Sequence, residues 1–141
     1  MDAALTDSTL TPSSRSSKLR FGFGIALSAL PVLFLTFDSV IKLIRIQPVV
    51  QSFEQLGYPI HLATTIGVLE LLCLALYLVP RTAALGALLL TGFLGGAIST
   101  HLRVGDPLFS HTVFPLYVAA MVWGGLYLRD ERVRALLPFR K

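Results

Sequence analysis

Charged side chains interrupt the long apolar stretches of this chain at only a few positions. Asp38, Lys42 and Arg45 are spaced i, i+4 and i+7, so a helix would carry all three on one face. Glu70 stands alone, with apolar residues on both sides. Charges within apolar segments are rare in proteins and are mostly paired or functional, which makes these residues the first candidates for chemistry.

Glu70 has no charged partner within its own apolar segment. An unpaired carboxylate in an apolar environment is costly, so Glu70 is expected to be protonated or to be paired with a residue of another helix. If it is protonated, one hydrogen bond between helices would satisfy it. A role as a proton carrier or as a ligand contact is the functional alternative.

Asp38 has two alternative environments. It can pair with Lys42 one helical turn later, or it can face the other helices and hold His101, His61 or Arg103. When residues are placed at about 1.5 Å of helix each, all of these lie in one half of the apolar segments or at its rim. We therefore expect polar side chains to gather in one half of the molecule and inert packing to fill the other.

The three histidines, His61, His101 and His111, raise the question of a metal or haem site. None of them has the short spacing of a helix-borne motif such as His-x-x-x-His, and zinc needs about four ligands in a fixed geometry. No metal site is predicted, and His101 is expected to donate a hydrogen bond or to shuttle a proton. Glu70 and His101 are the candidate catalytic residues. The candidate ligand contacts are Asp38, Lys42, His61, Glu70, His101 and Arg103.

The elements that must position these residues are long and apolar. The chain has 141 residues, of which 54% are hydrophobic and 14% charged, whereas about 25% of a typical soluble domain is charged. Four apolar segments, 21–40, 61–79, 82–102 and 112–128, each reach the ~17–25 residues that a membrane-spanning helix needs. The sequence thus predicts an all-α integral membrane four-helix bundle with antiparallel up-down topology.

The polar segments divide the chain further. Residues 1–20 are rich in Ser and Thr and are predicted to be a disordered tail, ahead of a transmembrane domain over 21–137 and a basic C-terminal end over 138–141. Residues 48–56 are predicted to form a short interfacial helix, with Gly57 ending it in a left-handed conformation. The short link Pro80-Arg81 makes its two flanking helices antiparallel neighbours.

The distribution of basic residues predicts the orientation. One side of the bundle would carry nine Lys and Arg residues and the other side three, namely Lys42, Arg45 and Arg103. Because cytoplasmic loops of membrane proteins are enriched in Lys and Arg, both termini are predicted to be cytoplasmic. The net charge is +4, but the basic residues flank the apolar segments and form no basic stripe, so no nucleic-acid partner is expected. The single Cys73 permits no disulfide within one chain.

Small residues gather on two of the predicted helices. Small residues spaced four apart let helix backbones approach closely in a membrane, so these positions are predicted to pack helices together. Room for a flat ligand against bare backbone, or the contact surface of a dimer, are the alternatives. The predicted packing residues are Gly92, Gly95, Gly96, Ser99, Gly124 and Gly125.

Several of these features together resemble the DoxX-like family of small bacterial membrane proteins. The resemblance rests on Gly57-Tyr58-Pro59, Glu70, Pro80-Arg81, the segment from Leu90 to Arg103 with its Gly-Gly-Ala and Thr-His-x-Arg motifs, and the segment from Trp123 to Asp130. It covers residues 21–137. It implies a four-helix bundle in a bacterial inner membrane, and a distant link to quinone chemistry, because the family takes its name from a subunit of a thiosulfate:quinone oxidoreductase.

Three functional hypotheses follow. The first is a membrane subunit of a quinone-linked redox system that binds a lipophilic molecule, with Glu70 and His101 handling protons. The second is a non-catalytic membrane partner that assembles or stabilises other proteins. The third is a small-solute or proton transporter, for which the chain is short. No nucleotide, acyl-transfer or other cofactor motif is present in the sequence, so the chain is not expected to be an enzyme on its own, and a quinone is the cofactor that the first hypothesis would require.

Overall fold

The structure, a computed structural model, describes residues 12–136, which form helices joined by short links and contain no strand within that range. Four helical segments are long and apolar enough to cross a membrane: Arg15–Ile44, His61–Leu78, Ala83–Val104 and Leu108–Arg129. The elements in chain order are α1 (Pro12–Ile44), α2 (Gln47–Gln55), α3 (His61–Leu78), α4 (Ala83–Val104), η1 (Leu108–Thr112), α5 (Phe114–Arg129) and α6 (Glu131–Leu136).

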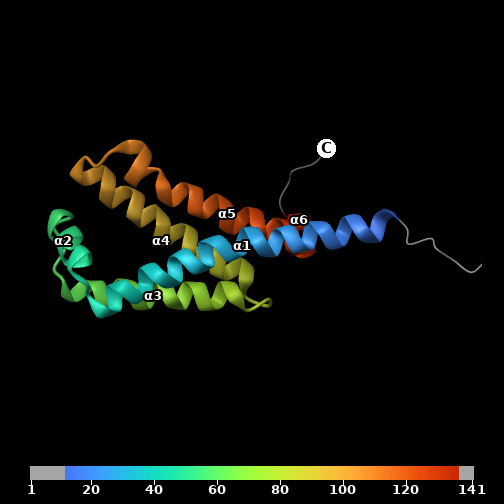
Figure 1. The fold of residues 1–141 in the computed structure, drawn as a ribbon, viewed down its shortest axis with the longest axis horizontal. Helices are drawn as coiled ribbons and strands as arrows, with labels where there is room; N and C mark the ends of the chain where they lie inside the picture. Colours follow the sequence, from blue (N-terminus) through green and yellow to red (C-terminus); the bar gives the residue numbers. More distant parts are fainter. Residues whose placement is uncertain (1–11, 137–141) are drawn as a thin grey trace, which may run out of the picture.

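The four long helices form a ring in which α1 packs against α3 and α5, and α4 packs against the same two helices from the other side. Figure 1 shows α2 and η1 at one end of the bundle, and α6 with the link between α3 and α4 towards the other. We call these the α2 end and the α6 end. Towards the α2 end, α4 and α5 diverge from α1 and α3 (Figure 1).

The main hydrophobic core packs the four long helices together where they have not yet diverged. Its fully buried residues include Tyr77 of α3, Leu90 of α4 and Val122 of α5. The Tyr77 hydroxyl donates to the Val122 carbonyl oxygen at 2.9 Å and lies 3.0 Å from the Ser28 hydroxyl oxygen. A buried hydroxyl needs such partners, so this one contact network connects α1, α3 and α5.

Most of the glycines that let helices approach closely are not the ones predicted to do so. A Cβ at Gly86 of α4 would lie 2.7 Å from the Leu76 carbonyl carbon of α3, and a Cβ at Gly24 of α1 would lie 3.0 Å from the Arg129 backbone nitrogen of α5. Among the expected positions, Gly125 approaches the Ser28 backbone of α1 and Gly124 approaches Leu27. The small residues of α5 therefore face α1 rather than α4.

The expected packing face of α4 differs in the structure. A Cβ at Gly92, Gly95 or Gly96 would meet no atom within 4 Å among the described residues, and Ser99 is exposed. These residues lie where α4 has separated from its neighbours, so they do not pack α4 against another helix of residues 12–136. The open space beside them leaves the two alternatives, a ligand or a second chain.

The helix boundaries also depart from expectation at the N-terminal side. α1 begins at Pro12 instead of about residue 21, so residues 12–20, expected in the polar tail, are helical. Residues 1–11 and 138–141 of the predicted tail and basic end lie outside the described part. The short helix predicted over residues 48–56 is α2, which spans Gln47–Gln55 and buries Val49 and Phe53. Gly57 has φ +71, which confirms its left-handed conformation.

Candidate functional site

An ion-pair cluster links α1 to α3 within the spanning segments. Lys42 bonds to Asp38 one turn earlier in α1, and its Nζ lies 2.8 Å from Glu70 Oε2 of α3. Of the two environments expected for Asp38, the structure has the local pair with Lys42. Of those expected for Glu70, it has the pairing across helices. The Glu70 side chain is fully buried, whereas the Asp38 side chain is 30% exposed.

Lys42 and Glu70 come within bonding distance because a glycine, Gly67, lets α3 approach α1 closely. A Cβ at Gly67 would lie 3.1 Å from the Ser39 carbonyl oxygen and 3.2 Å from Lys42 Cβ, so α3 approaches the α1 backbone closely at this point. Glu70 follows Gly67 by three residues and therefore shares its face of the helix. The missing side chain at residue 67 thus positions the carboxylate at residue 70.

One carboxylate oxygen of this cluster has no hydrogen-bond partner among the residues that the structure describes. Glu70 Oε1 is buried and forms no hydrogen bond with any described residue. A carboxylate has about four acceptor positions, and a buried acceptor without a donor costs roughly 1–3 kcal/mol. The Glu70 side chain is therefore left with unused acceptor capacity.

Glu70, Lys42 and Asp38 line a cavity of about 630 Å³ between the diverging helices. A volume of this size is typical of small-molecule sites, which occupy ~300–1,000 Å³. The wall is mainly apolar and includes five aromatic side chains. These are Phe34, Phe53, Tyr58, Phe93 and Phe114. The Phe93 ring centroid lies 5.6 Å from Lys42 Nζ, which is within cation–π range.

The cavity is open to the surroundings, because several of its lining residues are exposed. On α3 and α4 these include Leu69, which is 51% exposed, and the exposed Gly92 and Gly96. On α1 and α5, Phe34 and Phe114 are 41% and 40% exposed, and their rings meet edge to face with centroids 5.1 Å apart. Because all four helices include membrane-spanning segments, these exposed lining residues would face lipid.

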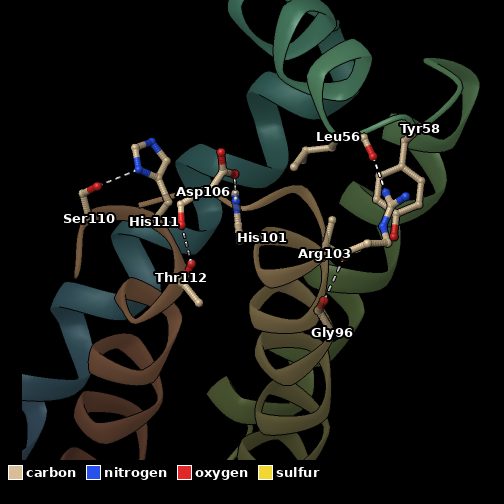
Figure 2. A network of polar contacts seen from close by, with 10 residues as sticks. Leu56, Tyr58, Gly96, His101, Arg103, Asp106, Ser110, His111 and Thr112 are labelled. Carbon is tan, nitrogen blue, oxygen red and sulfur yellow. Dashed lines mark hydrogen bonds and ion pairs between the residues drawn. The ribbon is translucent and has the colours of Figure 1, made fainter. Parts of the chain in front are cut away.

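The segment from α2 to Tyr58 covers the α2 end of the cavity. The Arg103 guanidinium of α4 donates to the Leu56 carbonyl oxygen and lies 5.8 Å from the centroid of the Tyr58 ring. The Thr100 hydroxyl donates to the Gly96 carbonyl oxygen at 2.9 Å and accepts from the Tyr58 hydroxyl at 3.1 Å. Figure 2 shows Arg103 reaching from α4 to this segment. Arg103 therefore holds the cover in place and does not line the cavity.

A second polar group lies at the same end. His101 Nδ1 and Asp106 Oδ2 are 2.6 Å apart, and the rings of His101 and His111 lie 6.0 Å apart. His111 Nδ1 is 2.8 Å from the Ser110 hydroxyl oxygen (Figure 2). Both histidines line the cavity. Within residues 12–136, no group of three His, Cys, Asp or Glu side chains is placed to hold a metal ion.

The structure thus brings together most of the residues expected to contact a ligand. Asp38, Lys42, Glu70 and His101 line one cavity. His61 is exposed and lies outside it, because the first residue of α3 precedes the part of that helix that faces the cavity. Sequence reasoning missed the aromatic lining, since apolar rings in apolar helices give no distinct pattern. It also missed the role of Gly67.

The comparisons with known proteins agree with this architecture. No curated protein and no solved structure matches the chain. The model of the DoxX-like family matches residues 26–125, a range that contains every residue lining the cavity and parts or all of the four membrane-spanning segments. This match confirms the resemblance found in the sequence. The chain is a multi-pass membrane protein that belongs to the DoxX-like family.

Proposed function

We propose that this protein binds a lipophilic molecule with a polar head in the cavity between its diverging helices. The observation that carries the proposal is Glu70 Oε1, a buried acceptor without a donor among the described residues, in a helix that lines an apolar cavity of about 630 Å³. A ligand hydroxyl would supply the missing hydrogen bond. Such a molecule would enter directly from the bilayer past exposed lining residues such as Leu69, Gly92 and Gly96.

The head group that suits this site is a quinone in its reduced, hydroxyl-bearing form. Glu70 Oε1 can accept from a phenolic hydroxyl. Lys42 carries three N–H donors, of which Asp38 and Glu70 use two, so a third is available to a ligand oxygen. The Phe93 ring beside Lys42 offers an aromatic face to the ligand ring. The chain would then serve as the quinone-binding membrane subunit of a redox system whose electrons come from another subunit.

Orientation and location are part of the same proposal. We place the protein in a bacterial inner membrane as an antiparallel up-down bundle with both termini cytoplasmic. Seven described basic residues lie towards the α6 end and three towards the α2 end, which supports a cytoplasmic α6 end. The seven are Arg15, Lys18, Arg20, Arg81, Arg129, Arg132 and Arg134, and the three are Lys42, Arg45 and Arg103. Reporter fusions after residues 58, 81, 106 and 141 would test this, with an external readout expected only for the first and third.

Ligand binding is tested with the purified protein in detergent micelles. A short-chain benzoquinol, kept reduced, is titrated while the thermal unfolding temperature is followed, since a ligand stabilises the state that it binds. We expect Glu70→Gln to weaken binding by at least about tenfold, because a charged acceptor is worth ~1.5–3 kcal/mol. Glu54→Gln, at an exposed position on α2, is the matched control. Equal binding by all three proteins would refute the proposal.

A second candidate function is that of a non-catalytic assembly partner, either in a homodimer or with another membrane protein. It is favoured by the exposed face of Gly92, Gly95, Gly96 and Ser99, which contacts no other helix of the described chain. Crosslinking in native membranes discriminates the two functions. Gly95→Leu would abolish a constant crosslinked partner if this face docks a helix. Recovery of monomer alone would count against assembly.

A further inference from the structure

A second cavity lies towards the α6 end, away from the ligand cavity. Its volume is about 420 Å³. Its lining residues belong to the link between α3 and α4 and to the junction of α5 with α6. The lining residues are Pro80, Arg81, Arg129, Asp130, Glu131 and Arg132. Three guanidiniums and two carboxylates thus surround one small space.

The two carboxylates of this cavity are already engaged. Asp130 Oδ1 accepts the Arg132 backbone N–H at 2.9 Å, as a residue preceding a helix commonly does. Glu131 Oε1 lies 3.0 Å from a terminal nitrogen of Arg134, a residue that does not line the cavity. Among the described residues, no carboxylate pairs with the guanidiniums of Arg81, Arg129 or Arg132. With three guanidiniums against two carboxylates, the lining carries a net charge of +1, and none of its guanidiniums is held in an ion pair with a described carboxylate.

Arg129 is the most constrained of the three. Its guanidinium lies over the Tyr77 ring, with the guanidinium carbon 5.0 Å from the ring centroid. Its Nε and one terminal nitrogen are buried and form no hydrogen bond with any described residue. Buried guanidinium donors are costly when they are unsatisfied. A planar guanidinium with free donors fits a phosphate oxygen pair closely.

The position of the cavity indicates the source of that phosphate. It lies at the ends of two membrane-spanning segments, where lipid head groups meet the protein. Leu78 and Val79, directly before Pro80, are 53% and 49% exposed and offer apolar surface to acyl chains. Basic pockets at helix ends are a known means of holding anionic head groups. From the unpaired arginines and this placement, we propose that the cavity lined by Arg81, Arg129 and Arg132 binds the phosphate of an anionic phospholipid.

The proposal is tested with the full-length protein in a non-ionic detergent. Dioleoyl phosphatidylglycerol or dioleoyl phosphatidylcholine is added in increasing amounts while the thermal unfolding temperature is measured. We expect the anionic lipid to raise this temperature and the zwitterionic lipid to leave it nearly unchanged. Arg81→Gln and Arg129→Gln should each increase the half-saturating concentration of phosphatidylglycerol about five- to tenfold.

The control is Arg20→Gln, which removes the same charge from an exposed position on the part of α1 that lies towards the α6 end and outside the cavity. It should leave the lipid response unchanged. If Arg129→Gln does not fold, Arg81→Gln alone decides, because Arg81 is exposed in a loop. Equal stabilisation by both lipids, or an unchanged response in Arg81→Gln, would overturn the proposal. Full replacement of the lipid effect by millimolar inorganic phosphate would show a soluble-anion site and overturn the lipid assignment.

Discussion

Lys42 and Glu70 join two membrane-spanning helices through a hydrogen-bonded ion pair, with 2.8 Å between Nζ and Oε2. The pair lies at the wall of a cavity, and within residues 12–136 no donor reaches the other carboxylate oxygen, Glu70 Oε1. A pair that served stability alone would be expected to satisfy both oxygens, because an unsatisfied buried acceptor is costly. The half-satisfied carboxylate is therefore the feature that most clearly separates this site from ordinary packing.

Removal of Lys42 should expose the cost of burying Glu70. In Lys42→Met, the carboxylate loses its only cationic partner among the described residues and must either remain charged without it or take up a proton. Breaking a buried pair in this way costs roughly 3 kcal/mol or more. We expect a loss of that size in the free energy of unfolding, measured by titrating purified protein in mixed micelles with a denaturing detergent and following helicity.

Two further variants show whether this loss comes from Glu70. The double variant Lys42→Met/Glu70→Leu should recover most of the stability, since it leaves no unpaired carboxylate on α3. Asp38→Asn should cost less than about 1 kcal/mol, because the Asp38 side chain is 30% exposed and Glu70 keeps its partner. A double variant no more stable than Lys42→Met would show that the pair does not account for the loss.

Glycines on α4 should differ sharply in their tolerance of a methyl group. In Gly86→Ala, the new Cβ would lie 2.5 Å from Tyr77 Cα of α3 and closer still to the Tyr77 nitrogen, so the two helices must move apart. Overpacking of this kind costs ~1–3 kcal/mol. Gly95→Ala meets no atom within 4 Å among the described residues and should be neutral or stabilising by up to about 1 kcal/mol. Equal unfolding free energies for the two variants would contradict the observed helix separation.

The Tyr77 hydroxyl should contribute measurably to the joint between helices. Tyr77→Phe removes its hydrogen bond to the Val122 carbonyl and its contact with Ser28, at a cost of about 1 kcal/mol. The ring stays, so the stacking of Arg129 is preserved. Tyr117→Phe, at a position 51% exposed on α5, is the matched control and should not change the unfolding free energy. A neutral Tyr77→Phe would mean that the buried hydroxyl makes no net contribution.

Much of the fold was predictable from the sequence because hydropathy and length determine it. A helix is the simplest element that satisfies its own backbone in lipid, so four apolar segments of about 20 residues predict four spanning helices. The start of α1 was not predictable in this way. Residues 12–20 are polar, and hydropathy detects the membrane boundary rather than the helix, which continues from residue 20 back to Pro12.

The site was predictable in its charges and not in its shape. Asp38, Lys42 and Glu70 stood out because charge is rare in such segments, and counting residues along the helices placed them in the same half of the apolar segments. Counting residues along a helix does not show which part of it faces a cavity, and His61, the first residue of α3, proved to lie outside the cavity. The glycines illustrate the same limit. Gly86 and Gly92 differ only in whether a neighbouring backbone is near, and that depends on where α4 diverges.

The cover of the cavity supplies a final prediction. Arg103 connects α4 to the Leu56 carbonyl, and Tyr58 donates to Thr100, so two contacts hold the segment from α2 to Tyr58 against α4. In Arg103→Gln, the shorter neutral side chain would lose both the carbonyl bond and the stacking on Tyr58. We expect amide hydrogen exchange over residues 47–58 to become about five- to tenfold faster, which corresponds to a loss of ~1–1.4 kcal/mol in local opening free energy.

The matched control for this cover is Arg45→Gln, which removes a cation at the same end of the bundle. Arg45 donates to the Thr64 hydroxyl of α3 and forms no hydrogen bond or ion pair with the described residues of α4, so the amide exchange of residues 47–58 should stay close to that of the parent protein. If the cover also limits access to Glu70, Arg103→Gln should speed quinol association and dissociation together while changing the dissociation constant little. Unchanged exchange in Arg103→Gln would show that the buried face of Val49 and Phe53 holds α2 in place without Arg103.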